Sequence, residues 1–373
     1  MLPLNWQRVR LGDIGKPCMC KRVMKHQTTQ YGEIPFYKIG TFGNTADAFI
    51  SKKLFLEYKT KYSFPKKGDI LISASGTIGR AVIYDGKPAY FQDSNIVWID
   101  NDETLVKNDF LFYIYSHVKW NTEHTTILRL YNDNFRNTLI PLPPLNEQIA
   151  IANILSGLDR YLCSLDALIL KKESVKKALS FELLSQRKRL KGFNQAWQRV
   201  RLGDICEIVK GQQINKISLN NTDKYPVING GIDFLGYTNK FNVSKNTIAI
   251  SEGGTCGYVR FMTSNFWSGG HNYSLQKISN KVNNLCLYHI LKSYEKDIMK
   301  LGVGSGLKNI QLKALKDFEI LLPPLNEQIA IANILSDLDN EIISLKNKKR
   351  QFDNIKKALN HDLMSAKIRV LKK

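Results

Sequence analysis

Two long segments of the chain place apolar residues three and four positions apart, the spacing of helices that pack along one stripe. These positions are Leu155, Leu158, Leu162, Leu165, Ile169, Val175, Leu179 and Leu183 in the first segment, and Leu335, Leu338, Ile342, Leu345, Phe352, Ile355, Leu359 and Leu363 in the second. No Pro or Gly interrupts residues 158–191 or 325–373. The pattern predicts two helices of about 43 residues, each about 64 Å long, that pair as an intramolecular antiparallel coiled coil.

The sequence before each segment fits a helix start. A Pro-Pro pair at 143–144 or 323–324 cannot continue a helix and commonly precedes one. Asn146 and Asn326 follow as N-cap candidates, with Glu147 and Glu327 in the first turn, where a carboxylate complements the helix dipole.

The remaining stretches, 1–141 and 192–321, mix short apolar runs with Gly, Asn and Ser turns, which indicates α+β domains. Predicted strands are Ile70–Ser73, Ala81–Tyr84 and Ile96–Ile99, then Thr247–Ser251, Tyr258–Met262 and Tyr273–Ile278. Helices are predicted near 109–120 and 284–299. The glycine pairs at 76 and 79 and at 254 and 257 favour tight hairpin turns. A phosphate-cradling loop is the alternative there, but the Walker spacing is absent.

The two halves of the chain are versions of one unit. WQRVRLGDI at 6–14 recurs at 197–205, and LPPLNEQIAIANILS at 142–156 recurs at 322–336. Between these blocks only traces survive, such as ISASGTIG (72–79) against ISEGGTCG (250–257). Two copies suit a pseudo-two-fold molecule in which one chain imitates a homodimer. Identical blocks indicate a shared task, whereas diverged stretches are free to do different ones.

The charge points to a polyanionic partner. The chain carries 54 basic and 33 acidic residues, a formal net charge of +21, and nucleic acid is the simplest polyanion to match it. No apolar run approaches the ~20 residues needed to cross a bilayer, and the start MLPLNWQRVRLGDI lacks the apolar stretch of a signal peptide. We therefore expect a cytoplasmic protein with no membrane partner. The six cysteines are interpreted as free thiols; Cys18 and Cys20 as metal ligands are the alternative.

Loops rich in amide, hydroxyl and basic side chains are the candidates for contact with DNA. Asn and Gln can pair with adenine and Arg with guanine, while Lys mostly contacts phosphate. The first domain offers Lys21, Arg22, Lys25, Gln27, Lys38, Asn44, Gln92, Asn95, Arg129, Asn132 and Arg136, and the second offers Lys210, Gln212, Gln213, Lys216, His271, Asn272, Ser305, Lys308 and Asn309. Their neighbours His26, Thr41, Ser94, Tyr131, Asn134, Asn215 and Ser268 have the same character.

Catalytic motifs are missing from the sequence. G-x-S-x-G, H-E-x-x-H, P-loop and dinucleotide-binding patterns do not occur, and the histidines form no constellation with Cys or carboxylates. We predict neither catalytic residues nor metal ligands. A nuclease or methyltransferase is therefore disfavoured, and a coiled-coil scaffold with non-specific DNA binding is the second interpretation.

The repeated segments resemble the specificity (S) subunit of type I restriction–modification systems, over essentially the whole chain. The P-L-P-P-L-x-E-Q-x-x-I pattern occurs at Pro141–Ile151 and, with Leu replacing the first Pro, at Leu321–Ile331. The W-x-x-V-x-L-G-D-I openings add to it, as does G-S-G-x-x-x-I at Gly304–Ile310. The first half has TTILRLYNDNF (125–135) in place of that last element.

The resemblance implies target-recognition domains at 1–141 and 192–321 and conserved spacer helices at 142–191 and 322–373. Each domain would read one half of a bipartite site in double-stranded DNA. Two methyltransferase (M) subunits would dock on the helices, with restriction (R) subunits as further partners. S-adenosylmethionine, ATP and Mg²⁺ would belong to those subunits, so this chain needs no cofactor. The predicted docking residues are Leu145, Gln148, Ile149, Leu325, Gln328 and Ile329.

Overall fold

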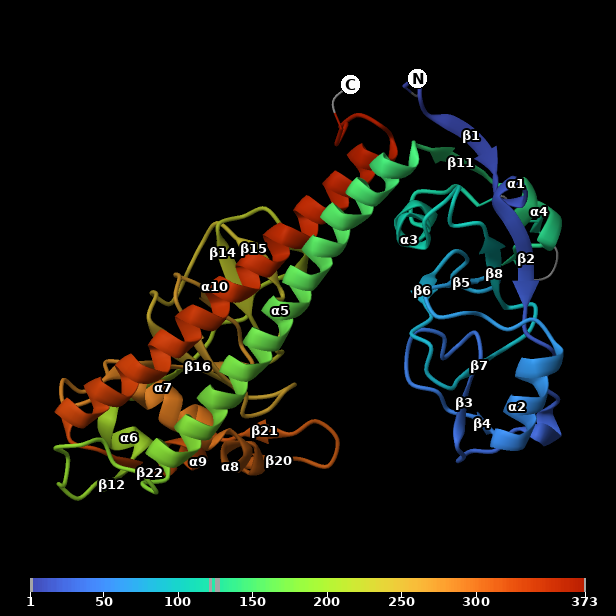
Figure 1. The fold of residues 1–373 in the computed structure, drawn as a ribbon. Helices are drawn as coiled ribbons and strands as arrows, with labels where there is room; N and C mark the ends of the chain where they lie inside the picture. Colours follow the sequence, from blue (N-terminus) through green and yellow to red (C-terminus); the bar gives the residue numbers. More distant parts are fainter. Residues whose placement is uncertain (1–2, 121–122, 125–127, 372–373) are drawn as a thin grey trace. The chain divides into compact units, whose positions relative to one another are not determined.

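The computed structural model describes residues 3–120, 123–124 and 128–371. Its contacts divide the chain into two compact units. The first unit joins Met1–Leu165 to Lys348–Lys373, and the second is the continuous stretch Asp166–Asn347. Each unit therefore contains one half of each long helix (Figure 1).

The first unit is built on a four-stranded sheet of order β2-β8-β5-β6, in which every pairing is antiparallel. Its strands are β2 (Gly15–Met19), β5 (Ile70–Ser73), β6 (Ala81–Ile83) and β8 (Ile96–Asn101). Helix α3 (Asn108–Tyr115) contributes Phe110, Leu111 and Ile114 to the core beside this sheet. A mixed sheet, β4-β3-β7, lies over a second core. Its strands are β3 (Ile34–Tyr37), β4 (Phe49–Ile50) and β7 (Tyr90–Phe91).

Short elements complete the first unit. A two-stranded sheet pairs the start of the chain with the segment that leads into the first long helix. The elements are β1 (Gln7–Arg10), α1 (Leu11–Ile14), 3-10 helix η1 (Lys25–Gln27), α2 (Lys52–Lys61), β9 (Glu123–His124), β10 (Leu128–Arg129), α4 (Asn132–Asn137) and β11 (Leu139–Leu142).

The second unit repeats this plan strand for strand. Its sheets have the orders β13-β19-β16-β17, β15-β14-β18 and β12-β22, and its β20–β21 pair corresponds to the β9–β10 pair of the first unit. The strands are β12 (Gln198–Arg201), β13 (Glu207–Lys210), β14 (Tyr225–Ile228), β15 (Gly236–Thr238), β16 (Thr247–Ser251), β17 (Val259–Met262), β18 (Trp267–Ser268), β19 (Asn272–Gln276), β20 (Gly302–Val303), β21 (Asn309–Ile310) and β22 (Glu319–Leu322). The helices are α6 (Leu202–Ile205), η2 (Lys216–Ser218), α7 (Asn284–Ser293), α8 (Glu295–Lys300) and α9 (Leu312–Lys316). Helix α2 occurs in the first unit and α8 in the second, so the copies differ by local insertions.

The predicted strands are confirmed with small shifts at their ends. Ile70–Ser73 and Thr247–Ser251 match β5 and β16, and each forms a hairpin with the next strand. The glycines of both turns have positive φ, 66° and 82° at Gly76 and Gly79, which is the conformation that the hairpin interpretation requires. The predicted helix at 109–120 is shorter, and that at 284–299 is divided into α7 and α8 at Tyr294.

The two long helices are α5 (Leu145–Leu184) and α10 (Leu325–Met364), 40 residues each. In the first unit Asp159 pairs with Lys356, and the ring of Tyr161 lies 4.8 Å from that of Phe352. In the second unit Lys172 Nζ lies 2.8 Å from Glu341 and Lys176 contacts Asp339. Residue numbers rise on one helix as they fall on the other, so the segments run antiparallel within each unit (Figure 1).

The predicted N-caps are wrong by two residues. Both helices begin directly after the second proline, and the carbonyl of Pro144 accepts hydrogen bonds from the amides of Glu147 and Gln148. The carbonyl of Pro324 accepts one from Gln328 in the same way. Asn146 and Asn326 are thus the second residue of each helix, because the proline carbonyl already starts the ladder.

The helix ends also fall short of the uninterrupted sequence. Gln186 and Ala366, which follow α5 and α10, have positive φ of 60° and 57°. These left-handed residues turn the chain out of the helix although no Pro or Gly requires it. The turn directs the segments after the helices into other contacts, described below.

Among the described residues no helix is long and apolar enough to span a membrane. The same part of the chain contains no group of three or more His, Cys, Asp or Glu side chains placed to hold a metal ion.

Candidate nucleic-acid interface

In the second unit, three of the predicted DNA loops converge on Glu252. One oxygen of this carboxylate accepts hydrogen bonds from Lys210 Nζ at 2.7 Å and from the Tyr273 hydroxyl at 3.1 Å. His271 Nδ1 lies 3.9 Å from the other oxygen. The Glu252 amide donates to the His271 carbonyl, and the Glu252 carbonyl accepts from Ile310, the residue after Asn309. The structure therefore brings together Lys210 from the end of β13, His271 from the turn before β19 and Asn309 from β21.

The loop at 211–213 is fixed against the same region. The Gln212 amide donates to the Ser268 carbonyl at 2.8 Å, and the indole of Trp267 donates to the Gln212 carbonyl at 2.9 Å. A Cβ added at Gly270 would lie only 2.5 Å from Gln213 Oε1, so the end of this side chain lies close to the glycine. Both glutamine side chains are exposed and remain available to a ligand.

Further out, Lys216 lies on η2, and Ser305 and Lys308 lie on the β20–β21 hairpin, all exposed. The hairpin is anchored at its base through Ile310 and Glu252. The sequence prediction thus located solvent-accessible polar groups on both elements, although no described contact joins Lys216 to the Glu252 cluster.

The first unit has an equivalent cluster around Asn95. Arg129 donates from Nη2 to Asn95 Oδ1 at 3.0 Å and to the Ser94 carbonyl at 3.2 Å, and Ser75 Oγ donates to the same Asn95 oxygen. The amide of Ala74 donates to the Asn95 carbonyl, and the amide of Leu130 donates to the Ala74 carbonyl. In the second unit, Glu252 makes the same two backbone bonds, one to His271 and one to Ile310. Ala74 therefore corresponds to Glu252, Asn95 to His271 and Leu130 to Ile310. Arg129, the residue before Leu130, takes the place of Asn309. The stretch 125–135 therefore replaces the Gly304–Ile310 element; its residues 125–127 lie outside the described residues.

The other candidates of the first unit are either exposed or bonded to other parts of the unit. Arg22 pairs with Asp93 at 3.1 Å, which ties the loop after β2 to the loop before β8. Exposed Lys21 and Lys25 extend from the same loop. The remaining members have internal partners: Gln27 accepts from the Met24 amide, Gln92 accepts from the Ile39 amide, and Lys38 pairs with Asp47 at 2.8 Å.

Asn44, Asn132 and Arg136 are exposed at other places. Asn44 lies in the loop between β3 and β4. Asn132 and Arg136 lie on α4, which packs against α1 at Gly12. These two residues are not among the side chains that surround Asn95.

Asn272 and Ser268 cannot contact DNA in this structure. Asn272 is 2% exposed and donates from Nδ2 to Ser268 Oγ at 3.0 Å and to the Tyr273 carbonyl at 3.1 Å. Ser268 is fully buried and is bonded through its backbone to Asn242. The prediction is wrong because both residues face the interior where β18 meets β19, which residue type alone does not reveal.

Glu252, the centre of the second cluster, is not among the residues predicted from the sequence. It could have been found by aligning the two turns ISASGTIG and ISEGGTCG, where Ala74 of the first copy is aligned with an acid in the second. A buried carboxylate beside basic side chains is unusual unless it orients those cations. Tyr273, whose pKa burial raises well above its usual range, is the neutral donor that accompanies it.

At the helix starts, repeated residues form the same buried cluster in both units. Trp6 donates from its indole to Glu147 at 3.1 Å, and Arg369 binds the same carboxylate through Nε at 2.6 Å and Nη2 at 2.9 Å. In the second unit Trp197 and Arg189 do this to Glu327, at 3.1 Å for the indole and 2.7 Å for both guanidinium nitrogens. Both carboxylates are nearly inaccessible.

These clusters explain why the chain leaves each helix in a left-handed turn. Arg189 follows α5 and binds the start of α10, whereas Arg369 follows α10 and binds the start of α5. The signal was present in the sequence as an arginine at the same offset after each helix.

Gln148 and Gln328 are internal ties, which corrects their assignment as docking residues. Each is 1% exposed. Gln148 donates to the carbonyls of Leu105 and Pro143 and accepts from the Lys107 amide. Gln328 does the same with Lys281, Pro323 and Asn283. With every hydrogen bond made inside the unit, neither side chain can meet a partner.

The other four predicted docking residues stay accessible. Ile149 is 42% exposed, Leu325 39% and Ile329 40%, and Leu145 is half-buried. They form the apolar outer surface of the first turns of α5 and α10.

Comparison with known proteins identifies the family. The model of the type I restriction modification DNA specificity domain matches residues 3–172 and again residues 194–352. The chain therefore belongs to this family, with two copies of its domain.

The relatives agree with this assignment. A putative type I restriction enzyme specificity subunit from Haemophilus influenzae is 64% identical over 148 residues, which is 39% of this chain and 38% of that protein. A putative specificity subunit from Methanocaldococcus jannaschii is 30% identical over 335 residues, or 81% of this chain and 79% of that one. The crystal structure of an S subunit from M. genitalium superposes with a TM-score of 0.71 at 20% identity, covering 97% of this chain and 98% of that chain, which shows a shared fold.

Proposed function

We propose that the chain is the sequence-specific DNA-binding subunit of a type I restriction–modification complex. It recognises a bipartite site in double-stranded DNA, with one recognition domain for each half-site. It selects the sequence and leaves catalysis to other subunits.

One observation carries this proposal: two units of identical strand order present different polar clusters at the same place. The second unit offers Lys210, His271 and Asn309 around Glu252, whereas the first offers Arg129 around Asn95. Side chains of these types discriminate base edges in the major groove, and exposed lysines add attraction to phosphate. Different clusters on one scaffold suit two different half-sites.

We further propose that residues 1–141 and 192–321 are the recognition domains and that 142–191 and 322–373 form an antiparallel coiled-coil spacer. Helices of 40 residues correspond to about 60 Å. On this proposal the repeat is a pseudo-two-fold one, with the long helices setting the distance between half-sites.

The exposed apolar side chains at the helix starts are proposed to dock two methyltransferase subunits. Leu145 and Ile149 on α5 have identical counterparts, Leu325 and Ile329, on α10, as two identical partners require. S-adenosylmethionine would enter with those subunits. Restriction subunits, with ATP and Mg²⁺, would complete a cleaving complex.

The test is modification mapping of a host that carries genes for this chain and its methyltransferase partner. Long-read sequencing should find methylated adenines in a split motif, two short half-sites separated by unspecified bases. A host with the methyltransferase gene alone is the control and should show no such motif. A continuous motif, or none, would refute the bipartite proposal and leave the scaffold interpretation.

A second experiment assigns the domains to half-sites. Replacing Gln212, Gln213 and Lys216 by Ala should change or weaken only the half-site read by the second unit. Replacing Arg129 by Ala should affect only the other half-site. Equal loss at both half-sites from either variant would contradict the separation of roles.

A further inference from the structure

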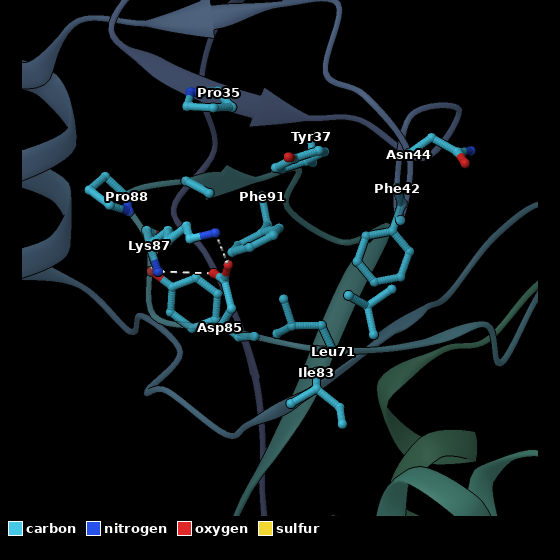
Figure 2. Close-up of a pocket in the computed structure, with 14 residues that line it drawn as sticks. Pro35, Tyr37, Phe42, Asn44, Leu71, Ile83, Asp85, Lys87, Pro88 and Phe91 are labelled. Carbon is cyan, nitrogen blue, oxygen red and sulfur yellow. Dashed lines mark hydrogen bonds and ion pairs between the residues drawn. The ribbon is translucent and has the colours of Figure 1, made fainter. Parts of the chain in front are cut away.

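The first unit contains a cavity of about 370 Å³ beside its small mixed sheet (Figure 2). Leu71 and Val82 line it from β5 and β6, and Tyr37 and Phe91 line it from β3 and β7. Phe42 closes it from the loop after β3, with Asn44 as a neighbouring polar group. The volume is within the range of about 300–1,000 Å³ typical of small-molecule sites.

The aromatic walls of the cavity are held in fixed positions. Tyr37 and Phe91 are stacked with 5.8 Å between ring centroids and an interplanar angle of 17°, and Tyr84 meets Phe91 edge-on at 5.6 Å. The Tyr84 hydroxyl donates to the Lys87 carbonyl, which fixes the loop that carries Asp85. A hydrogen bond from the Lys87 amide lowers the pKa of Asp85, so this carboxylate is an anionic acceptor near neutral pH. A preformed cavity of this kind suits a flat ring.

The second unit has a planar cationic side chain at the position of Val82. In the sheet register Leu71 pairs with Val82, and Ala249 pairs with Arg260, so Arg260 is the counterpart of Val82. The Arg260 guanidinium carbon lies 5.0 Å from the ring centre of Phe234 and 5.3 Å from that of Tyr258. Its Nη2 donates to the carbonyls of Gly231 and Ile232, in the loop after β14. In the second unit, the position of Val82 thus belongs to a planar nitrogen group that lies against two aromatic rings.

The first unit's cavity has room for a group larger than a guanidinium, and Tyr37, Val82 and Phe91, which line it, have different counterparts in the second unit. The volume far exceeds that of one guanidinium group. Val82 and Phe42 belong to the diverged part of the repeat. A protein partner that binds both halves in the same way would meet the cavity in one half and Arg260 in the other, so such a partner does not suit the cavity. The DNA half-sites, in contrast, differ. The neighbouring Asn44 is also one of the predicted DNA contacts.

We infer that this cavity binds a nucleobase, stacked against the aromatic walls, with Asn44 and Asp85 contacting its hydrogen-bonding edge. A carboxylate accepts from the exocyclic amino group of cytosine, adenine or guanine, which thymine lacks. The favoured source is an unpaired base of the half-site read by the first unit, and this source rests on the proposed function. A free nucleoside has the same chemistry.

Binding of free nucleosides is the first arm of the test. Saturation-transfer NMR on the full-length chain with adenosine, guanosine, cytidine and thymidine should show transfer to the amino-bearing nucleosides and weaker transfer to thymidine. Val82→Arg, which places the second unit's residue in the cavity, should abolish it. Arg260→Val is the matched control and should leave it intact. Thermal unfolding of both variants verifies that they fold.

The second arm examines DNA, using the complex of the chain with its methyltransferase. Duplexes carry one mismatch at each position of the first half-site in turn, the methylated adenine excepted. Because a mismatch removes part of the cost of unstacking, one position should bind about tenfold tighter or more. Val82→Arg should remove this gain and Arg260→Val should not.

The outcomes separate the sources and the two proposals. Nucleoside transfer lost in Val82→Arg supports the base site, and a mismatch gain lost in the same variant supports DNA as its source. If neither effect occurs while the wild-type complex still selects its motif, the cavity inference is overturned and the proposed function stands. If the wild-type complex selects no sequence, the proposed function fails, and with it the DNA source.

Discussion

Replacing Gln148 or Gln328 by Leu distinguishes an internal tie from a docking residue. Each glutamine makes three hydrogen bonds inside its unit, for Gln148 at 2.9 to 3.0 Å and for Gln328 at 2.7 to 3.1 Å. Leucine has a similar volume but leaves one amide and two carbonyls without a partner. At about 1 kcal/mol for each net hydrogen bond, the expected loss is about 3 kcal/mol, and more where the orphaned groups stay dry.

The loss should be confined to one unit. Urea denaturation followed by hydrogen exchange should show Gln148→Leu weakening protection in β1 and β11, and Gln328→Leu weakening protection in β12 and β22. Asn153→Ala, at an exposed position one turn further along α5, is the matched control and should be neutral.

Affinity for the methyltransferase provides the opposing test. Under conditions where the variants are folded, binding should change less than about twofold, because the buried amides cannot meet a partner. Unchanged stability together with lost methyltransferase binding would refute the assignment as internal ties and restore the docking hypothesis.

Three further predictions concern other parts of the molecule. Burial lowers the pKa of His289 from 6.5 to about 4, so the unfolded chain binds the proton first and the second unit should lose stability as pH falls from 6.5 to 4. His289→Gln should flatten this part of the stability curve in pH-dependent denaturation, and an unchanged curve would contradict burial of His289 as the cause. Arg369→Gln should increase hydrogen exchange at β1 and β11 only, and Arg189→Gln at β12 and β22 only, whereas uniform exchange in either variant would show that the ion pairs do not act locally. Deleting one matched heptad from both α5 and α10 shortens each helix by ~10 Å, so modification mapping should show a DNA spacer shorter by at most about three base pairs and unchanged half-sites. Altered half-sites with an intact spacer would contradict the proposed role of the helices.

Much of the fold could be predicted because local signals agreed with tertiary structure. The strands at Ile70–Ser73 and Thr247–Ser251 are buried apolar runs that end at glycine turns, and nothing in the final packing opposes them. The long helices follow from their spacing and their proline starts. Their ends did not follow, because Gln186 and Ala366 turn the chain to satisfy buried carboxylates elsewhere in the sequence.

The candidate site was predicted in kind and only partly in detail. Gln213 and Lys308 are exposed, as the prediction of a DNA contact requires, and their role stays a prediction. Asn272, Gln148 and Gln328 have the same chemistry but are buried, and burial depends on neighbours far away in the sequence. The equivalence of Arg129 and Asn309 could not be predicted from residue type, because it is defined by the backbone hydrogen bonds of Ala74 and Glu252.

The exchange of helix ends between the units has a consequence for biosynthesis. The core of the first unit includes Leu363 and Met364, with Leu359 and Val370 packed against it. It therefore lacks part of its interior until residues 359–370 have been translated. The second unit is one continuous stretch, Asp166–Asn347, and can close while the ribosome is still adding the rest. The first unit, whose synthesis starts before that of the second, is thus completed after it, and a premature stop before residue 359 would damage the unit that began to be made earlier.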